Sequence, residues 1–233
     1  MPDLKSFFSW STGKDSALAL HYLLQRDEYR VEHLLTTVNA HYQRVTMHGL
    51  PVALLEQQID ALGIPGTMVQ LPQHASYDDY EACMREAVLK LKADGCNYAA
   101  FGDIFLEDLK EYRVKQMAAV DVETVFPIWQ RDTTELIHEF IDAGFKAIVV
   151  CANAALLDES FVGRVIDSDF VRDLPAGVDP CGENGEFHTF CFDGPIFSHP
   201  IAFSVGETVL REYEHDGVTT GFWFCDLIAG APS

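Results

Sequence analysis

The segment SWSTGKDS (Ser9–Ser16) decides how the N-terminal part of this chain folds. It follows an apolar run with two adjacent phenylalanines and precedes ALALHYLL, in which Ala17, Leu20 and Leu24 fall on one helical face. An apolar strand, a small polar loop and an amphipathic helix are therefore predicted in that order. Unpaired backbone N–H groups and the helix dipole make such a helix N-terminus a binding place for an anion.

The composition of this loop favours a phosphate site, with a capped turn at the start of a helix as the alternative. Gly13 permits close approach of the backbone to a ligand, Lys14 supplies a cation, and three hydroxyl groups can donate hydrogen bonds (Ser11, Thr12 and Ser16). The loop is not a Walker motif, because Asp15 stands between the lysine and the serine and no glycine lies at the required distance upstream. Transfer of a terminal phosphate is the weaker interpretation.

Short apolar runs alternate with amphipathic segments through the first two thirds of the chain. This alternation predicts right-handed βαβ units and a parallel sheet with helices on both faces. Apolar residues at helical spacing indicate one helix between Gly49 and Gly63 and another through Tyr80, Met84 and Leu91. The expected strands are residues 6–10, 33–38, 66–71, 98–104, 124–129 and 146–152.

After about Leu156 the sequence changes to turns rich in Gly, Pro and Asp, which separate short aromatic runs such as FHTFCF and TGFWFC. We expect an α/β fold, with a Rossmann-like, doubly wound and mainly parallel sheet and a smaller mixed α+β domain at the C-terminus. Residues 1–130 are assigned to the first domain and 131–233 to the second, with the boundary left open between 130 and 156. The segment 133–150 could close the first sheet or open the second unit.

The 233 residues include 16 Lys and Arg against 36 Asp and Glu, which gives a formal charge of −20. A charge of this sign repels nucleic acids and anionic membrane surfaces, yet a small anion can still bind in one focused pocket. The sequence has no run of about 20 apolar residues and no cationic leader followed by an apolar stretch. We therefore expect a cytoplasmic protein with neither membrane nor nucleic-acid partners.

The loop resembles the PP-loop of the N-type ATP pyrophosphatases, adenine nucleotide alpha hydrolases with a HUP-type fold, which cradles the pyrophosphate part of ATP. Thr12 stands where those enzymes most often have glycine. Further segments are similar, in order, to the diphthine–ammonia ligase (diphthamide synthase) family. They are FGDI (101–104) followed by Arg113, PIW (127–129), CGENGEFHTF (181–190) and DGPIF (193–197). The resemblance spans nearly the whole chain.

This resemblance implies an ATP-dependent, AMP-forming carbon–nitrogen ligase. A substrate carboxylate would attack the α-phosphorus of ATP, pyrophosphate would leave, and ammonia would displace AMP, with Mg²⁺ neutralising the phosphates. The family's substrate is diphthine, a modified histidine of elongation factor 2. The acyl substrate of this chain is left open between a modified protein side chain and a small carboxylate, and assembly into a homo-oligomer is left open as well.

The resemblance and the positions at strand ends give an expected nucleotide site. ATP is expected to contact the loop and the end of the strand at 98–104, through Ser11, Thr12, Gly13, Lys14, Asp15, Ser16, Gly102 and Asp103. Asp15 and Asp103 are candidate Mg²⁺ ligands or organisers of the loop. Lys14 and Arg113 are expected to neutralise charge on the reacting phosphorus and the departing pyrophosphate. A solvated helix position is the alternative for Arg113.

The block GENGEFHT (182–189) places two glycines among polar side chains, which a tight turn could project toward one place. Its candidate substrate-binding residues are Glu183, Asn184, Gly185, Glu186, His188 and Thr189. Glu186 and His188 are both candidates to orient ammonia and take its proton. A hairpin turn with exposed polar tips is the alternative. His48, in a strand-to-helix connection, is expected to line the pocket or to lie in a helix N-cap region.

Three other functions stay open at this point. A small-molecule amidating relative, for example one that acts on cobalamin precursors, would use the same chemistry. A non-catalytic adenine nucleotide sensor would release no pyrophosphate and would not need the acidic block at 183–189. A tRNA-modifying PP-loop enzyme should have a basic surface and reactive cysteines, and the charge of −20 disfavours it.

Overall fold

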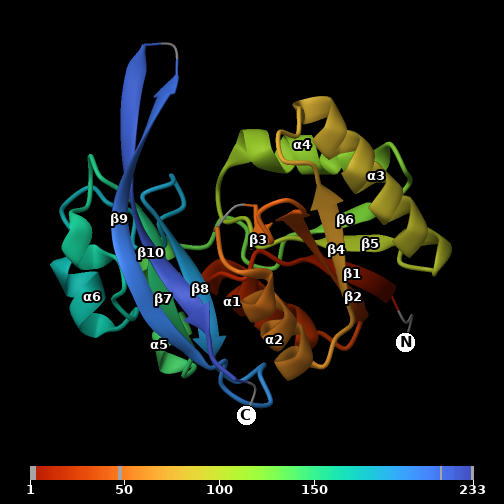
Figure 1. Ribbon diagram of the computed structural model, residues 1–233. Coiled ribbons are helices and arrows are strands. Elements are labelled where there is room, and N and C mark those ends of the chain that lie inside the picture. The colour runs from red at the N-terminus through yellow and green to blue at the C-terminus, as the bar shows by residue number, and fades with distance from the viewer. Residues whose placement is uncertain (1–3, 47–48, 216, 232–233) are drawn as a thin grey trace.

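Two β-sheets form the centre of the molecule, as the computed structural model of residues 4–46, 49–215 and 217–231 shows (Figure 1). The N-terminal half of the chain forms a mainly parallel sheet, and the C-terminal part forms a separate antiparallel sheet beside it. The predicted α/β class, with a doubly wound sheet and a mixed C-terminal unit, is confirmed. In the described ranges no helix is long and apolar enough to cross a membrane.

The strand order of the first sheet is β3-β2-β1-β5-β6, with β4 pairing to β2. β1 runs parallel to both β2 and β5, so the chain winds outward in two directions from β1. The carboxyl ends of the strands at such a reversal of order are where open α/β sheets bind ligands. The strands are β1 (Leu4–Ser9), β2 (Tyr29–Asn39), β3 (Arg44–Val45), β4 (Gly66–Leu71), β5 (Tyr98–Ala100) and β6 (Glu123–Val125).

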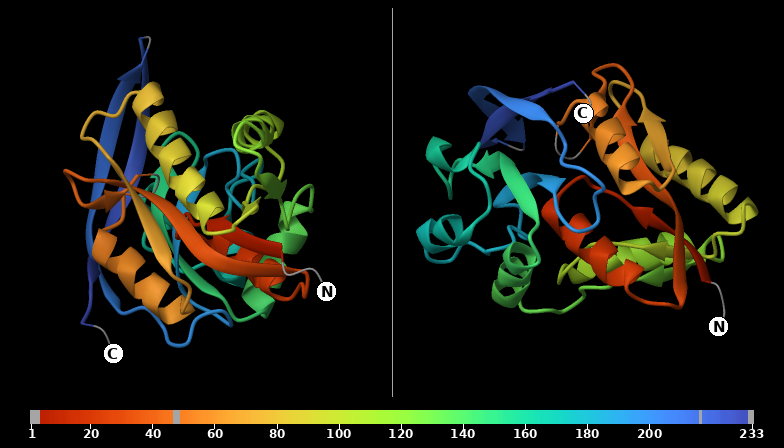
Figure 2. Two further views of the ribbon diagram at one scale, coloured as in Figure 1. Left: turned by 90° about the vertical axis from the view of Figure 1, so that its right-hand side faces the viewer. Right: turned by 90° about the horizontal axis from the view of Figure 1, so that it is seen from below.

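Helices cover both faces of this sheet. Helices α1 (Lys14–Leu24) and α2 (Val52–Leu62) lie on the face toward the second sheet, and α3 (Tyr77–Ala93) and α4 (Glu107–Ala118) lie on the other (Figures 1 and 2). Buried residues of α1 and α2 share one core with the second sheet, whereas those of α3 and α4 pack in a separate core. The predicted helix stop at Gly63 is confirmed, since this residue caps α2 with φ 65°.

The second sheet has the antiparallel order β8-β7-β10-β9. Its β7 contains residues 146–152, so of the two alternatives that the sequence left open for the segment 133–150, the structure shows the second, in which the segment opens the C-terminal unit. All residues of β7 except its first and last are buried, and a strand buried on both faces reads as a continuous apolar run whichever sheet it enters. The elements of this part are α5 (Thr133–Asp142), β7 (Lys146–Asn153), η1 (Glu159–Phe161), α6 (Ser168–Asp173), β8 (Phe187–Asp193), β9 (Phe203–His215) and β10 (Val218–Ala229).

Three further features differ from the sequence-based expectation. β5 and β6 are shorter than residues 98–104 and 124–129, because the chain turns away after Ala100 and before Pro127, which has no N–H to donate. β9 and β10 form one long hairpin that projects beyond the rest of the molecule, where short runs were expected (Figure 1). Helix α4 has a largely charged sequence in which only Met117 is buried, so no apolar periodicity predicts this helix.

Candidate functional site

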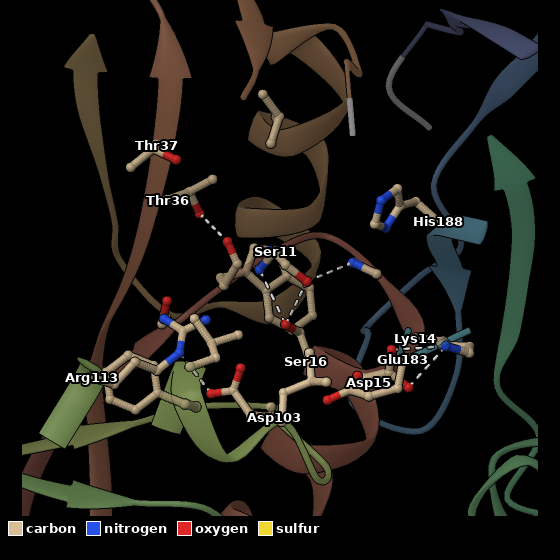
Figure 3. A pocket seen from close by; sticks show the side chains of 18 of the residues that line it. Ser11, Lys14, Asp15, Ser16, Thr36, Thr37, Asp103, Arg113, Glu183 and His188 are labelled. Carbon is tan, nitrogen blue, oxygen red and sulfur yellow. Dashed lines mark hydrogen bonds and ion pairs between the residues drawn. The ribbon is translucent and has the colours of Figure 1, made fainter. Parts of the chain in front are cut away.

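A cleft of about 340 Å³ lies at the carboxyl ends of β1, β2 and β5, between the first sheet and the block at 182–189 (Figure 3). This volume lies at the lower end of the range for ligand pockets. The structure therefore brings together two blocks that lie about 170 positions apart in the sequence. Of the predicted site residues, the cleft is lined by Ser11, Gly13, Lys14, Asp15, Ser16, Gly102, Asp103, Arg113, Glu183, Gly185, His188 and Thr189.

The loop between β1 and α1 is compact and rich in hydrogen-bond donors. Gly13 is the N-cap of α1 in an extended conformation, and no side chain caps the helix there. The hydroxyl oxygens of Ser11 and Ser16 lie 2.7 Å apart, and the backbone nitrogen of Ser11 donates to Ser16 Oγ at 3.2 Å. The amide of Gly13 is directed at Ser11 Oγ at 3.4 Å. An anion at this helix terminus would meet both amides and hydroxyls.

Thr12 occupies the loop in a conformation that glycine adopts more easily. Its φ is 75°, and its side chain is buried and does not line the cleft. A β-branched residue at positive φ is strained, and such strain persists only where surrounding contacts impose it. The Thr12 carbonyl accepts hydrogen bonds from the Cys191 amide at 2.9 Å and from Gln58 Nε2 at 3.0 Å. Thr12 thus takes part in the loop through its backbone.

Lys14 is buried against its neighbour in the sequence. Its ammonium lies 2.9 and 2.8 Å from the two carboxylate oxygens of Asp15 and also donates to the Cys181 carbonyl. Burial by itself would lower the pKa of Lys14, but the charge and hydrogen bonds of Asp15, with smaller effects of Cys181 and Glu183, raise it. The lysine side chain is 3% exposed and that of Asp15 is 29% exposed, so this cation stays charged at the inner end of the cleft (Figure 3).

The segment after β5 approaches α1 closely and carries an ion pair. A Cβ on Gly102 would lie 3.1 Å from both Cα and N of Ser16, so any larger residue would push the helix start away. Asp103 Oδ2 lies 2.7 Å from Arg113 Nε, and the Arg113 guanidinium stacks over Phe101 at 4.6 Å. Burial raises the pKa of Asp103, against the opposing effect of Arg113. The Arg113 side chain is 25% exposed and faces the cleft, which rules out the solvated alternative.

The opposite wall presents two titratable groups, Glu183 and His188, whose pKa values are shifted by burial. Glu183 Oε1 accepts a hydrogen bond from the Ile104 amide at 2.9 Å, which ties this wall to the end of β5. Burial raises the pKa of Glu183 to about 7, against the hydrogen bond from Ile104 and with the help of the Asp15 charge. Burial and then the charge of Lys14 lower the pKa of His188, so its imidazole is neutral at pH 7.

Two predicted residues of this wall point away from the cleft. Glu186 is 3% exposed, and its Oε1 accepts hydrogen bonds from the Asp179 amide and from Asn184 Nδ2, both at 3.1 Å. Neither Glu186 nor the exposed Asn184 lines the cleft. Asp179 in turn accepts from the amides of Cys181 and Glu183 at 2.9 and 3.2 Å. Glu186 and Asp179 therefore shape the turn that carries Glu183. His48 lies outside the described residues.

The two carboxylates predicted to hold Mg²⁺ each lie beside a cation. Asp15 pairs with Lys14, and Asp103 pairs with Arg113. Within the described part of the chain, no three His, Cys, Asp or Glu side chains are arranged to enclose a metal ion. Magnesium at nucleotide sites is commonly bound by one or two carboxylates together with phosphate oxygens. Asp15 and Asp103 on the cleft surface meet that requirement only with phosphate present.

The cleft also has lining residues that sequence reasoning missed. Thr36 and Thr37 lie near the carboxyl end of β2, and Thr36 Oγ1 donates to the Trp10 carbonyl at 2.8 Å. Sequence reasoning could have identified them, because polar residues near the carboxyl end of a strand that neighbours β1 lie at the same edge of the sheet as the loop. Tyr80 of α3 and Tyr112 of α4 line the cleft too, and nothing in their spacing indicated it.

A second hollow of about 1,130 Å³ adjoins the cleft. It lies between the end of β2 with β3 and the β9–β10 hairpin, and it shares Val45 and His188 with the cleft. Aromatic and charged side chains line it, among them Tyr42, Arg44, Arg211, Tyr213, Phe222, Phe224 and Asp226. His188 therefore stands where the two hollows meet.

Comparison with known protein families agrees with this geometry. Residues 4–123 match the model of the diphthamide synthase N-terminal domain, and residues 132–220 match that of the diphthamide synthase C-terminal domain. The chain belongs to the diphthamide synthase family. The N-terminal match contains the whole PP-loop, and the C-terminal match contains the entire block at 182–189.

Curated relatives of the family are similar to this chain at low identity. A diphthine–ammonia ligase from Danio rerio is 26% identical over 171 residues, which cover 65% of this chain and 66% of the relative. Those from Homo sapiens and Bos taurus are 29% and 30% identical, over 46% and 45% of this chain and 42% and 41% of the relatives. The matches thus span from about two fifths to just under two thirds of the relatives' length.

A solved structure described as a predicted subunit of a tRNA methyltransferase from Methanocaldococcus jannaschii aligns with a TM-score of 0.43 and 15% identity. The alignment covers 82% of this chain and 98% of that chain.

Proposed function

We propose that this protein is an ATP-dependent ligase that joins ammonia to a substrate carboxylate through an acyl adenylate, as a diphthine–ammonia ligase would. The observation that carries the proposal is the arrangement of the cleft. A PP-loop with a buried lysine faces Glu183 and His188 across the cleft. The two walls are joined by a hydrogen bond of 3.1 Å, which the backbone nitrogen of Lys14 donates to Thr189 Oγ1. Nucleotide-binding groups and titratable groups thus share one small space.

The chemistry proceeds in two balanced steps. A carboxylate oxygen attacks the α-phosphorus of ATP, so the new P–O bond gives the acyl adenylate and the bond to the β-phosphate breaks to release pyrophosphate. Ammonia then attacks the acyl carbon, the C–O bond to AMP breaks, and one proton leaves the nitrogen. Direct amide formation is slow because ammonia neutralises the acid and oxide is a poor leaving group, and adenylation removes both obstacles.

The loop wall binds and neutralises the phosphates. The start of α1, where the N-cap residue Gly13 has no capping side chain, receives the pyrophosphate part of ATP together with the Ser11 and Ser16 hydroxyls. Lys14 and Arg113 offset the charge that accumulates on the departing pyrophosphate. Asp15 and Asp103 would hold a Mg²⁺ ion together with phosphate oxygens, and this ion would supply further charge neutralisation when bound.

Residues of the opposite wall orient ammonia and accept its proton. Glu183 has a pKa of about 7, so near neutral pH it can accept a proton from ammonium and leave ammonia free to attack. His188, neutral because burial lowers its pKa, can accept a hydrogen bond from the nucleophile at the junction of the two hollows. Glu186 serves this wall by holding the turn at 179–184.

The acyl substrate enters from the larger hollow. That space opens onto His188, and aromatic residues with arginines are typical of surfaces that bind proteins. The relatives named diphthine–ammonia ligases point to diphthine as the acyl group. A small carboxylate is the competing substrate class.

Product analysis tests the proposal. The purified protein is incubated with α-³²P-ATP, ammonium and Mg²⁺, together with either elongation factor 2 that carries diphthine or a panel of small carboxylates. We expect AMP and pyrophosphate in equal amounts, one amide per AMP, and dependence on ammonium. Turnover only with a small carboxylate would assign the second substrate class, and ADP as the sole spent nucleotide would overturn the ligase itself.

A further inference from the structure

A buried glutamine on α2 contacts the loop without lining the cleft. Gln58 is fully buried, although glutamine is usually exposed. Its Oε1 accepts a hydrogen bond from Trp10 Nε1 at 2.9 Å, and its Nε2 donates to the Thr12 carbonyl at 3.0 Å and to the Cys191 carbonyl at 2.6 Å. The Gln58 side chain therefore links Trp10 and Thr12 of the loop to Cys191 of β8 in the other sheet.

The chemistry of these partners fixes the orientation of the amide. An indole nitrogen can only donate and a carbonyl oxygen can only accept, so the oxygen of Gln58 must face Trp10 and its nitrogen must face the two carbonyls. Both amide hydrogens are then used. A glutamate of the same shape would set a carboxylate oxygen against two carbonyl oxygens, and a methionine would fill the space with no hydrogen bond.

The Thr12 carbonyl is the atom on which this network converges. It receives Gln58 Nε2 and the Cys191 amide from the side of β8, and Thr12 adopts its strained φ of 75° there. A planar trans peptide points its C=O and N–H in opposite directions. Since the Thr12 carbonyl is held toward Gln58, the Gly13 amide points the other way, toward Ser11 Oγ and the cleft.

We propose that Gln58 is a positioning residue of the nucleotide site, which holds the Thr12–Gly13 peptide so that the Gly13 amide faces the bound pyrophosphate. Gln58 touches no substrate and acts through the Thr12 carbonyl. This inference rests on the proposed function in one respect, namely that the loop binds the pyrophosphate part of ATP. Successive amides turned to one side by a residue at positive φ form an anion-binding concavity.

The test compares two neighbouring glutamines of α2. Gln58→Met removes three hydrogen bonds and keeps the apolar volume, and the control Gln57→Met removes one hydrogen bond, from Gln57 Nε2 to the Gly230 carbonyl at 3.0 Å away from the cleft. Calorimetry at 15 °C measures the affinity for inorganic pyrophosphate and for ATP, and thermal melts report the fraction folded. We expect Gln58→Met to bind both about 10-fold more weakly and Gln57→Met to bind as the parent does.

A rescue separates positioning from folding. Glycine adopts a φ of 75° without strain, so Thr12→Gly in the Gln58→Met background should keep the peptide in place without the glutamine and recover most of the lost affinity. If Gln58→Met fails to fold, Trp10→Phe carries the same comparison on its folded fraction, with an expected loss of about 3-fold. This variant removes the indole donor to Gln58 and also part of the buried ring that packs against Phe8 and Phe197.

Equal pyrophosphate affinity in folded Gln58→Met and Gln57→Met would overturn the inference, as would a lower melting temperature with unchanged affinity. Failure of the parent protein itself to bind pyrophosphate or ATP would instead reject the proposed function, so the two failures are distinguishable.

Discussion

The two walls of the cleft are built in different ways. The loop wall at Ser11–Ser16 consists of backbone amides, hydroxyls and a buried lysine whose charge is permanent at neutral pH. The wall at 182–189 presents Glu183 and His188, whose pKa values burial moves to about 7 and below the usual histidine value. Under the proposed function, this difference separates phosphate binding from proton handling across the cleft, so changes to each wall should have different effects on the rate and its pH dependence.

Lys14→Ala should break the loop wall most severely. Loss of the buried ammonium removes charge stabilisation of the departing pyrophosphate and leaves Asp15 without its cation. We expect pyrophosphate release from ATP to fall about 10²- to 10³-fold at every pH. The control is Lys90→Ala, which removes an exposed lysine paired with Glu86 on α3. A rate within about 3-fold of the parent would show that the loop lysine does not serve the phosphates.

Glu183→Gln should change the pH dependence instead. In the parent, the rate should rise through an apparent pKa near 7 as the Glu183 carboxylate forms. In the variant this limb should disappear, with a rate about 100-fold lower at pH 8 and ATP affinity retained. Rate profiles between pH 5.5 and 9 measure both effects, and Glu212→Gln on exposed β9 is the control. An unchanged limb would assign that titration to another group.

The same group makes a prediction for stability. The pKa of Glu183 in the folded protein lies above its ordinary value of 4.5, so the fold favours the protonated form. This contribution is present below pH 4.5 and is lost as the pH rises through about 7. Denaturant unfolding at pH 5 and pH 8 should therefore show a smaller loss of stability for Glu183→Gln than for the parent.

Gly102→Ala should loosen the loop wall by geometry alone. The added Cβ would lie 3.1 Å from Cα and N of Ser16 and would push the first turn of α1 away from β5. We expect the KM for ATP to rise about 10-fold, with the pH profile unchanged. Gly221→Ala is the matched control, since its Cβ would meet its nearest neighbours at an ordinary 3.4 Å. Equal KM values for the two variants would contradict the close-approach argument.

Glu186→Ala should have the smallest effect on turnover. It leaves the Asp179 amide and the Asn184 side chain without their acceptor, so the free energy of unfolding should fall by about 1–3 kcal/mol. Turnover by the folded protein should fall far less than in Glu183→Gln, because Glu186 acts only through the turn that carries Glu183 and does not line the cleft. A loss of the pH limb as in Glu183→Gln would move Glu186 into the proton-handling wall.

The sequence by itself determined the loop wall and the class of fold. Strand, polar loop and helix follow one another within residues 4–24, so local rules place Gly13 and Lys14 at a helix start. The alternation of apolar runs and amphipathic helices likewise predicted the parallel sheet. It could not assign residues 146–152 to their sheet, because a doubly buried strand has the same apolar pattern in either one.

Only the tertiary structure decided which polar residues line the cleft and which ones stabilise its turns. GENGEFHT offers two glutamates three positions apart, and the turn directs Glu183 into the cleft and Glu186 onto the Asp179 amide. Gln58 in the middle of α2 gave no sign of a role, since its partners Trp10 and Cys191 lie 48 and 133 positions away. Backbone propensity acts over a few residues, whereas burial and hydrogen-bond partners depend on which segments the fold brings together.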